Sequence, residues 1–262
     1  MTLTLSQASL SAPPEKAEIS VIVPAYNEEE KIENTLERIV DVLEDLTDNG
    51  EVIIVDDGSE DYTYKRLKEF KARSEKIRLK LIRNGSNVGK GFAVRYGAEH
   101  ASADVIAIID ADMEINPSQI RRYIRMLEKY DACIASKRHP DSIYHAPFLR
   151  KILSRTFNAI TRLTTGLKFS DTQTGLKIIK TDAFRRIMDV IVVKRYAYDV
   201  EILLAAKLLN LKVVELPVRV ETKERFNLLS MFYMLKDLLG IAYRLRITKY
   251  YQKALLQTGL SH

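Results

Sequence analysis

Short apolar runs alternate with amphipathic segments along the first half of the chain. Four runs rich in Val and Ile predict strands at 18–23, 51–55, 77–83 and 105–109. Between them, apolar residues recur at helical spacing in 30–46, 62–73 and 91–101. Strands that alternate with helices predict βαβ units and a mostly parallel sheet. Because the strands are apolar at consecutive positions, we expect helices on both faces of that sheet.

The second half of the chain has a looser pattern. It predicts a helix at 117–130, a strand at 132–136, a loop at 137–147, a helix at 149–163, a strand at 174–179, a helix at 198–209 and a last strand at 213–220. The predicted fold class is therefore α/β. We expect a flexible lead at 1–17, one domain at 18–225 and a C-terminal amphipathic, basic helical segment at 226–262.

Residues 228–245 are apolar almost throughout and are long enough to cross a bilayer. However, Lys236 and Asp237 lie near the middle, and each charge at the centre of a spanning helix costs about 2.5–3.5 kcal/mol. A helix that lies in the membrane interface, with its basic residues at the headgroups, fits this pattern. Packing on the core, or on a second subunit in a homodimer, fits it equally.

Composition and charge narrow the classes of protein. The 262 residues are 46 % hydrophobic and 29 % charged, which excludes disordered, collagen-like and coiled-coil chains. The single cysteine, Cys133, excludes a disulfide framework and a cysteine-based zinc site, and it fits a reducing compartment. The formal charge of +6 favours an anionic partner such as a phosphorylated metabolite or a membrane surface. The first 17 residues do not resemble a signal peptide.

Polar motifs follow four of the predicted strands. They are PAYNE at 24–28, DDGS at 56–59, NVGKG at 87–91 and DAD at 110–112. In an open parallel sheet, ligands bind beyond the carboxyl ends of the strands. Asp110, Asp112 and Glu114 form an oxygen-rich cluster that fits a hard divalent cation, Mg²⁺ or Mn²⁺. Capping of the helix that begins at Pro117 is the alternative role for this segment.

Lys90 lies in a glycine-flanked turn that opens a predicted helix, an arrangement that suits a phosphate group. The spacing is not that of a P-loop, because Gly91 stands where a P-loop carries its metal-binding Ser or Thr. A dinucleotide-binding fingerprint is excluded as well, because the third glycine is missing. Taken alone, the DDGS segment fits a simple turn and helix cap equally well.

The four motifs, in this order, resemble the inverting family 2 glycosyltransferases of GT-A fold, and the resemblance covers most of the chain. It implies a Rossmann-like, mostly parallel sheet flanked by helices, and a nucleotide-sugar donor. The resemblance also implies a role for each motif residue: Pro24, Tyr26 and Glu28 border the base and ribose, Asp57 contacts the base, Lys90 lies near the nucleotide, Asp110 faces the ribose or the metal, Asp112 ligates the metal, and Glu114 is a second metal-side residue.

Two further segments indicate which subfamily the chain resembles. Residues 171–177 (DTQTGLK) and 196–201 (YAYDVE) are similar to segments of dolichyl-phosphate β-glucosyltransferases. This implies transfer of a hexose, with glucose from UDP-glucose favoured, to dolichyl or another polyprenyl phosphate with inversion. A GDP-mannose-dependent dolichyl-phosphate mannose synthase is the related alternative. Arg138, Arg150 and Arg155 match basic segments that lie near the phosphate groups in both subfamilies.

The implied reaction displaces a nucleoside diphosphate from the anomeric carbon of the sugar. A divalent cation would stabilise the charge on that leaving group, and Arg138 would supplement it. A lipid monophosphate is largely a dianion at neutral pH, so it needs cationic positioning more than a general base. Asp199 and Asp171 are the candidate catalytic carboxylates. Asp199 also fits an acceptor hydrogen-bond partner or a helix cap, and Asp171 fits a turn residue.

Alternative functions would require different residues. Transfer to a saccharide hydroxyl would make Asp199 the essential base. A catalytically silent nucleotide-sugar sensor would be expected to have lost Lys90 or the DAD motif, and both are intact. Nucleic acid is excluded as a partner because that class would interleave aromatic residues with basic ones and has no use for the acidic cluster. With no membrane-spanning anchor visible in the sequence, we expect peripheral association with the cytoplasmic face of a membrane.

Overall fold

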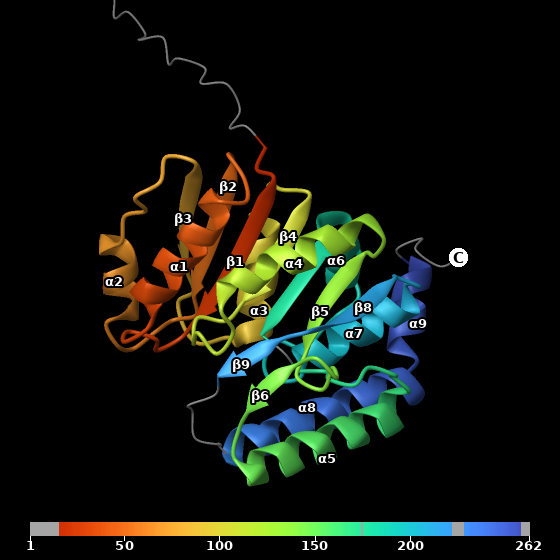
Figure 1. The fold of residues 1–262 in the computed structure, drawn as a ribbon. Coiled ribbons are helices and arrows are strands. Elements are labelled where there is room, and N and C mark those ends of the chain that lie inside the picture. The colour runs from red at the N-terminus through yellow and green to blue at the C-terminus, as the bar shows by residue number, and fades with distance from the viewer. Residues whose placement is uncertain (1–15, 174, 222–227, 258–262) are drawn as a thin grey trace, which may run out of the picture.

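A computed structural model describes residues 16–173, 175–221 and 228–257, so the predicted lead at 1–17 lies almost wholly outside the described residues (Figure 1). Its centre is a seven-stranded sheet with the strand order β3-β2-β1-β4-β7-β5-β8. The strands are β1 (Ile19–Ala25), β2 (Gly50–Asp56), β3 (Ile77–Arg83), β4 (Val105–Ile109), β5 (Ala132–Ser136), β7 (Leu176–Lys180) and β8 (Val213–Pro217). Only β7 runs antiparallel to its neighbours within this sheet. The predicted α/β fold with a mostly parallel sheet is therefore confirmed.

Helices cover both faces of the sheet, as the apolar strands predict (Figure 1). The helices are α1 (Ile32–Glu44), α2 (Thr63–Glu69), α3 (Lys90–Glu99), α4 (Ile120–Ile124), α5 (Phe148–Thr165), α6 (Thr181–Met188), α7 (Tyr198–Leu208), α8 (Leu228–Arg246) and α9 (Tyr250–Gln257). Consecutive residues of β1 show how one strand serves two cores. Val21 and Val23 pack with α1 and α4, whereas Ile22 packs with α3, α6 and α7.

The antiparallel strand β7 matters for the site because of where it begins. Its first residue, Leu176, pairs with Ile109 at the carboxyl end of β4. The residues at the start of β7 therefore lie beside the DAD motif, which follows β4 directly. A parallel strand in this position would have placed them at the opposite edge of the sheet.

Three predicted elements differ from the structure. The helix expected at 117–130 is broken into a 3-10 turn at Pro117–Gln119, the short helix α4 and a second 3-10 turn at Arg125–Glu128. The expected loop at 137–147 contains the strand β6 (Ile143–His145), which pairs with β9 (Arg219–Glu221). The last predicted strand divides into β8 and β9 because the chain leaves the large sheet after Pro217, and Val218 donates its backbone N–H to the Ser142 hydroxyl at 2.9 Å.

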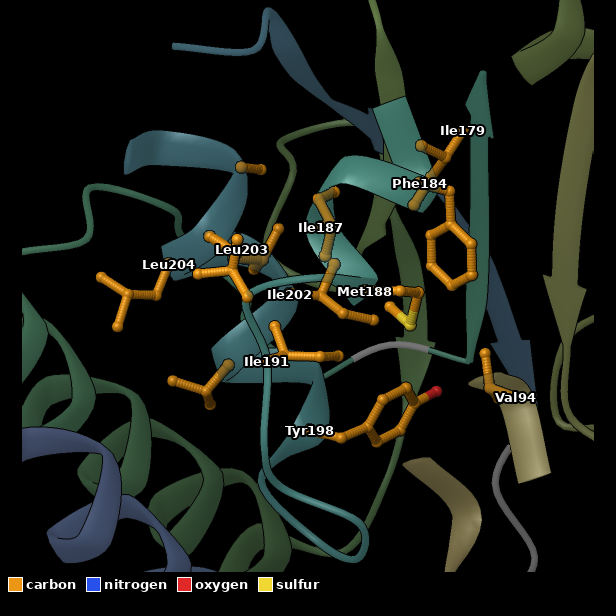
Figure 2. Packing of buried hydrophobic residues seen from close by; sticks show 14 of the residues in the cluster. Val94, Ile179, Phe184, Ile187, Met188, Ile191, Tyr198, Ile202, Leu203 and Leu204 are labelled. Carbon is orange, nitrogen blue, oxygen red and sulfur yellow. The ribbon is translucent and has the colours of Figure 1, made fainter. Parts of the chain in front are cut away.

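The two C-terminal helices pack on the main core. Leu238 and Ile241 of α8 and Tyr251 of α9 are fully buried in the cluster that includes α7. Figure 2 shows the centre of this cluster, where Ile187 and Ile202 lie above Tyr198. Helices α5 and α8 lie side by side at one end of the molecule (Figure 1). Across the described ranges, none of the helices has both the length and the apolar content that crossing a bilayer requires.

Candidate active site

A cleft of about 570 Å³ opens at the carboxyl ends of β1, β2 and β4. All six residues predicted to bind the nucleotide sugar line it: Pro24, Tyr26, Glu28, Asp57, Lys90 and Asp110. Asp112 and Asp199 line it as well. The edge of the sheet thus brings together motifs that are far apart in the sequence, because every parallel strand ends on the same side.

The first two motifs hold each other in place. The backbone N–H of Asn27 donates to the Ser59 hydroxyl at 3.0 Å, and the Asn27 side-chain oxygen accepts from the N–H of Glu60 at 2.9 Å. Asn27 has a φ of 55°, a left-handed conformation that Asn tolerates better than most residues. The turn after β2 therefore does act as a structural turn, and it also forms one wall of the cleft.

Asp57 organises the turn that contains Lys90. Its side chain is only 3 % exposed and accepts hydrogen bonds from the backbone N–H groups of Val88 at 3.0 Å and Gly89 at 2.7 Å. Gly89 has a φ of 119°, and a Cβ there would lie 2.4 Å from Cγ of Arg195. Only glycine fits this position. Asp57 lies at the cleft, where a contact with the base remains a prediction.

Two ion pairs lie against the ring of Tyr198. Lys90 Nζ is 2.5 Å from Asp110 Oδ1, and Lys177 Nζ is 2.6 Å from Asp199 Oδ1. The two ammonium groups are 5.6 and 5.7 Å from the centre of the Tyr198 ring. Burial alone would lower the pKa of Lys90, but the charge of Asp110 and then Tyr198 and Asp199 outweigh it, so the pKa of Lys90 is raised well above its ordinary value. The lysine is therefore a permanent cation in the cleft.

Glu114 and Arg150 are paired with each other. Both guanidinium Nη atoms of Arg150 lie 3.2 Å from Glu114 Oε1. The sequence assigns Glu114 to the metal and Arg150 to the acceptor phosphate. In the structure the two residues neutralise one another at the boundary between the segment that follows β4 and the start of α5.

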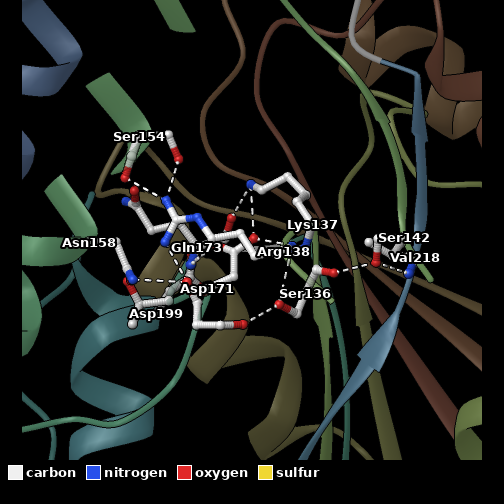
Figure 3. A network of polar contacts seen from close by, with 12 residues as sticks. Ser136, Lys137, Arg138, Ser142, Ser154, Asn158, Asp171, Gln173, Asp199 and Val218 are labelled. Carbon is white, nitrogen blue, oxygen red and sulfur yellow. Dashed lines mark hydrogen bonds and ion pairs between the residues drawn. The ribbon is translucent and has the colours of Figure 1, made fainter. Parts of the chain in front are cut away.

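A second, basic pocket of about 360 Å³ lies at the amino-terminal half of α5. It is lined by Lys137, Arg138, His139, Ser142, Tyr144, Lys151, Ser154 and Arg155. The Arg138 guanidinium donates to the backbone carbonyls of Ser170 and Ser154 (Figure 3). Burial lowers the pKa of Arg138, and the charge of Arg155 acts in the same direction although Asp171 opposes it. An anion in this pocket would relieve that crowding of positive charge.

Asp171 is placed outside both cavities. It is 2 % exposed, and its carboxylate accepts from the backbone N–H of Lys137 at 3.0 Å and of Gln173 at 3.1 Å (Figure 3). These contacts fix the loop that carries Arg138, so the geometry is that of a turn residue. Asp199, in contrast, lines the cleft.

Comparison with known proteins identifies the family. The family model described as glycosyl transferase family 2 matches residues 20–188. This range runs from β1 to the end of α6 and contains six of the seven strands of the large sheet. The chain belongs to glycosyltransferase family 2. The expected resemblance is thereby confirmed, and the protein is a glycosyltransferase.

Curated relatives are about 30 % identical to the chain over the aligned residues. It is 31 % identical to a dolichyl-phosphate beta-glucosyltransferase of Dictyostelium discoideum, over 86 % of this chain and 74 % of the relative. It is also 31 % identical to a dolichyl-phosphate beta-glucosyltransferase of Mus musculus, over 87 % of this chain and 75 % of the relative. Glycosyltransferase AglD of Haloferax volcanii is 29 % identical over 86 % of this chain, which spans only 36 % of the length of AglD.

Solved structures show the same fold. Glucosyl-3-phosphoglycerate synthase from Mycobacterium tuberculosis, in complex with Mn²⁺, UDP and glucosyl-3-phosphoglycerate, superposes with a TM-score of 0.63 at 20 % identity. The match covers 87 % of this chain and 79 % of that one. The same enzyme in complex with Mg²⁺ and UDP also gives a TM-score of 0.63, at 19 % identity. The GT-A fold of this family 2 chain is therefore confirmed.

The carboxylates of the DAD motif fit a divalent cation that is shared with a substrate. Burial, followed by the charge of Asp110, raises the pKa of Asp112 to about 7. A cation would favour the ionised form of this carboxyl group. Among the residues that the structure describes, no group of three or more His, Cys, Asp or Glu side chains could hold a metal. Mg²⁺ commonly takes only one or two carboxylates and completes its shell with phosphate oxygens and water, so Asp110 and Asp112 fit it.

Four residues at the cleft have no role predicted from the sequence. Arg195, Tyr196 and Tyr198 line the cleft, and Lys177 forms an ion pair with Asp199, which lines it too. Lys177 carries a signal that could have found it. A lysine between the apolar residues Leu176 and Ile178 interrupts a buried strand, and a buried lysine requires a carboxylate partner. Which carboxylate lies opposite depends on the tertiary structure.

We predict that Lys177→Met lowers the free energy of unfolding by about 3–5 kcal/mol, the cost of leaving one buried partner of an ion pair uncompensated. The side chain of Lys177 is 1 % exposed, so water would not replace the ammonium group around Asp199. Urea denaturation measures this loss.

Lys180→Met provides the control in the same strand. Lys180 pairs with Asp131 at 3.4 Å, and its side chain is 42 % exposed. Its replacement is expected to cost less than about 1 kcal/mol. Equal losses for the two variants would show that the Lys177–Asp199 pair contributes no more than a surface pair.

Proposed function

We propose that the protein transfers a hexose, with UDP-glucose as the preferred donor, to dolichyl phosphate or another polyprenyl phosphate with inversion at the anomeric carbon. The observation that carries this proposal is the presence of two cavities: a cleft lined by every predicted donor residue, and a basic pocket at α5. The Arg150–Glu114 ion pair joins α5 to the segment that follows the DAD motif. The names of the Dictyostelium and mouse relatives support both the sugar and the acceptor.

The cleft suits the donor. Pro24, Tyr26 and Glu28 would border the base and ribose, and Asp57 would contact the base from the adjoining turn after β2. Asp110 and Asp112 would hold Mg²⁺ or Mn²⁺ against the diphosphate. The bound cation supplies stabilisation for the negative charge that collects on the leaving diphosphate. Lys90 adds a fixed positive charge on the same side, held there by Asp110.

The basic pocket suits a phosphate monoester. Arg138 is anchored by two backbone carbonyls and so presents a fixed orientation, and Lys151 and Arg155 extend from α5 on the same side. Arg150 adjoins this pocket through its neighbour Lys151, while its own charge is balanced by Glu114. Cationic groups that are already positioned before binding favour a dianion with little reorganisation.

Asp199 fits an acceptor-positioning role better than that of a general base. Its carboxylate is buried against the Lys177 ammonium group, and taking up a proton would break that ion pair. A phosphate dianion needs no proton removed before it attacks the sugar. The Lys177–Asp199 pair therefore favours a lipid phosphate over a saccharide hydroxyl as the acceptor.

The lipid chain of such an acceptor requires a membrane surface, and we place it at α5 and α8. Phe148 on α5 is 79 % exposed, and Leu239 on α8 is 58 % exposed. Further exposed apolar side chains on these helices are Leu149, Ile152, Leu163, Phe232 and Tyr243. Helices α5, α8 and α9 carry eight Lys or Arg residues, of which Arg150 pairs with Glu114 and Arg244 with Glu201. The other six outnumber the one acid on these helices, Asp237, which favours anionic headgroups. The buried free Cys133 fits the reducing, cytoplasmic side of that membrane.

Transfer of label to lipid tests the function directly. Radiolabelled UDP-glucose and GDP-mannose are supplied in parallel with dolichyl phosphate, in Mg²⁺ or in EDTA. We expect label in the organic phase from UDP-glucose with Mg²⁺ only. Label from GDP-mannose alone would reassign the donor, and binding of UDP-glucose without lipid product would remove the acceptor.

In the same assay, Asp112→Asn is expected to lower kcat by a factor of about 10²–10³. This is the effect of removing one preorganised electrostatic group from the reacting centre. Asp182→Asn is the matched control, because Asp182 lies on α6 with a side chain that is 95 % exposed. Equal activity of the two variants would remove Asp112 from the metal site.

Arg155→Ala tests the acceptor pocket. We expect about a tenfold rise in the KM for a short, water-soluble polyprenyl phosphate, the effect of losing one charge-assisted contact, with the KM for the donor unchanged. Arg162→Ala, two turns further along α5, is the control and should leave both KM values unchanged. A rise in the donor KM alone would assign Arg155 to the cleft instead.

Flotation with anionic liposomes tests the membrane face. Replacing Leu239 and Tyr243 together by Ser should lower the partition coefficient at least about tenfold, because two exposed apolar groups no longer enter the bilayer. Tyr62→Ser, an exposed position beside α2 and away from α8, should float like the wild type (Figure 1). Wild-type protein that stays at the bottom of the gradient as a dimer would show that a second copy covers this face.

A further inference from the structure

One wall of the cleft is formed by residues 192–197, which connect α6 with α7. Within this segment, Arg195 and Tyr196 line the cleft. The Arg195 guanidinium donates to the backbone carbonyl of Asn87 at 2.8 Å, so the segment is tied to the turn that carries Lys90. The segment belongs to none of the helices or strands, and its position depends on contacts with its surroundings.

Carboxylates from two helices hold the backbone of this segment. Glu201 of α7 is fully buried and accepts from the N–H groups of Val192 at 2.8 Å and Val193 at 2.6 Å. Asp237 of α8 accepts from the N–H groups of Tyr196 at 3.1 Å and Ala197 at 3.3 Å. Each carboxylate therefore satisfies two donors that have no helical partner.

Asp237 provides an acceptor at the start of α7. The N-cap of α7 is Ala197, whose side chain accepts no hydrogen bond, and Asp237 accepts from the N–H of Ala197 itself and of Tyr196 before it. A carboxylate at this end also interacts favourably with the helix dipole. This explains the one acidic residue of α8, a helix that is otherwise apolar or basic.

The side chain of Tyr196 is held by the same helix. Its ring stacks on that of Tyr233 in α8, with the ring centres 5.7 Å apart and the planes 8° from parallel. Tyr196 is 37 % exposed and Tyr233 is 41 % exposed, so the pair lies at the mouth of the cleft rather than in the core. Helix α8 thus fixes both the main chain and the ring of Tyr196.

The segment has little room to move independently of the turn that carries Lys90. A Cβ on Gly91 would lie 2.6 Å from Cβ of Tyr198 and 2.9 Å from the carbonyl oxygen of Val193. The N–H of Phe92 donates to the Lys194 carbonyl at 3.0 Å. A shift of this wall would therefore disturb the adjoining turn, against which it packs.

We propose that Asp237 and Tyr233 are positioning residues for the donor: from α8 they hold Tyr196 and the start of α7 in the arrangement that binds the nucleotide sugar. The proposal rests on the proposed function, because it requires a nucleotide-sugar donor in this cleft. Tyr196 is then a donor-contacting residue, whereas Asp237 and Tyr233 act through it.

Steady-state kinetics of Asp237→Ala and Asp237→Asn test the proposal. Alanine removes the acceptor, and we expect the KM for UDP-glucose to rise about tenfold with a smaller change in kcat. Asparagine keeps an oxygen that accepts from the backbone, so its KM should return toward the wild-type value. Asp182→Ala, which removes an exposed carboxylate on α6 outside the cleft, is the control. A purely structural role would lower the active fraction, and with it kcat, while leaving KM unchanged.

Tyr233 gives a second, independent pair of variants. Tyr233→Leu should raise the KM for the donor, and Tyr233→Phe, which keeps the stacked ring, should not. Amide hydrogen exchange of the ligand-free protein measures how firmly the segment is held when no donor is present. In Asp237→Ala, the amides of Tyr196 and Ala197 should exchange faster, while the middle of α7 stays protected.

The outcomes separate the two proposals. Unchanged exchange at Tyr196 and Ala197, or a wild-type donor KM in both Asp237→Ala and Tyr233→Leu, would overturn the positioning role. If the wild-type protein transfers sugar from neither UDP-glucose nor GDP-mannose, while Asp237→Ala shows the expected faster exchange, the proposed function is overturned but α8 is still shown to hold the segment.

Discussion

The cleft depends on the charges arranged around Tyr198. Lys177 and Asp199 form a buried ion pair near the ring, and Lys90 and Asp110 form a second, more exposed ion pair near it. Neither member of the buried pair would be stable there alone, because an uncompensated charge in the interior is strongly unfavourable. The four residues come from α3, the end of β4, β7 and α7. The same contacts that satisfy the charges therefore also hold the carboxyl edge of the sheet in one arrangement.

Helix α5 joins the two cavities to the surface where we place the lipid. Its first turn carries Arg150, which pairs with Glu114 beside the DAD motif, and Lys151. Arg155 lies one turn further along and lines the basic pocket with Lys151. Phe148 and Leu149 are exposed at the same end. A phosphate at the end of an apolar chain would thus meet positive charge while the chain remained at the apolar surface, and no long channel through the protein is needed.

Helix α8 has two different faces, and each has a task in the proposed mechanism. Leu238 and Ile241 pack in the core, which fixes the helix, whereas Leu239 and Tyr243 are exposed. Asp237 and Tyr233 lie at the junction with the wall of the cleft. In the proposed mechanism, a helix that contacted the membrane on one side and the donor wall on the other would link the place where the acceptor arrives to the place where the donor binds.

The strands of the large sheet, their alternation with helices and the six donor residues could be predicted from the sequence. Strand β6 was not predicted, and Arg195, Tyr196 and Tyr198 of the cleft had no predicted role. Strands 77–83, 105–109 and 132–136 match β3, β4 and β5, because apolar β-branched runs have few other ways to be buried. All six predicted donor residues line the cleft because parallel strands bring their carboxyl ends to one edge. The pairing of charged groups, in contrast, is visible only in the folded protein: Glu114 pairs with Arg150, Asp199 with Lys177 and Asp237 with the start of α7. These partners are separated by many residues or lie on different elements, and a local pattern specifies that a buried charge needs a partner without specifying which one the fold will bring to it.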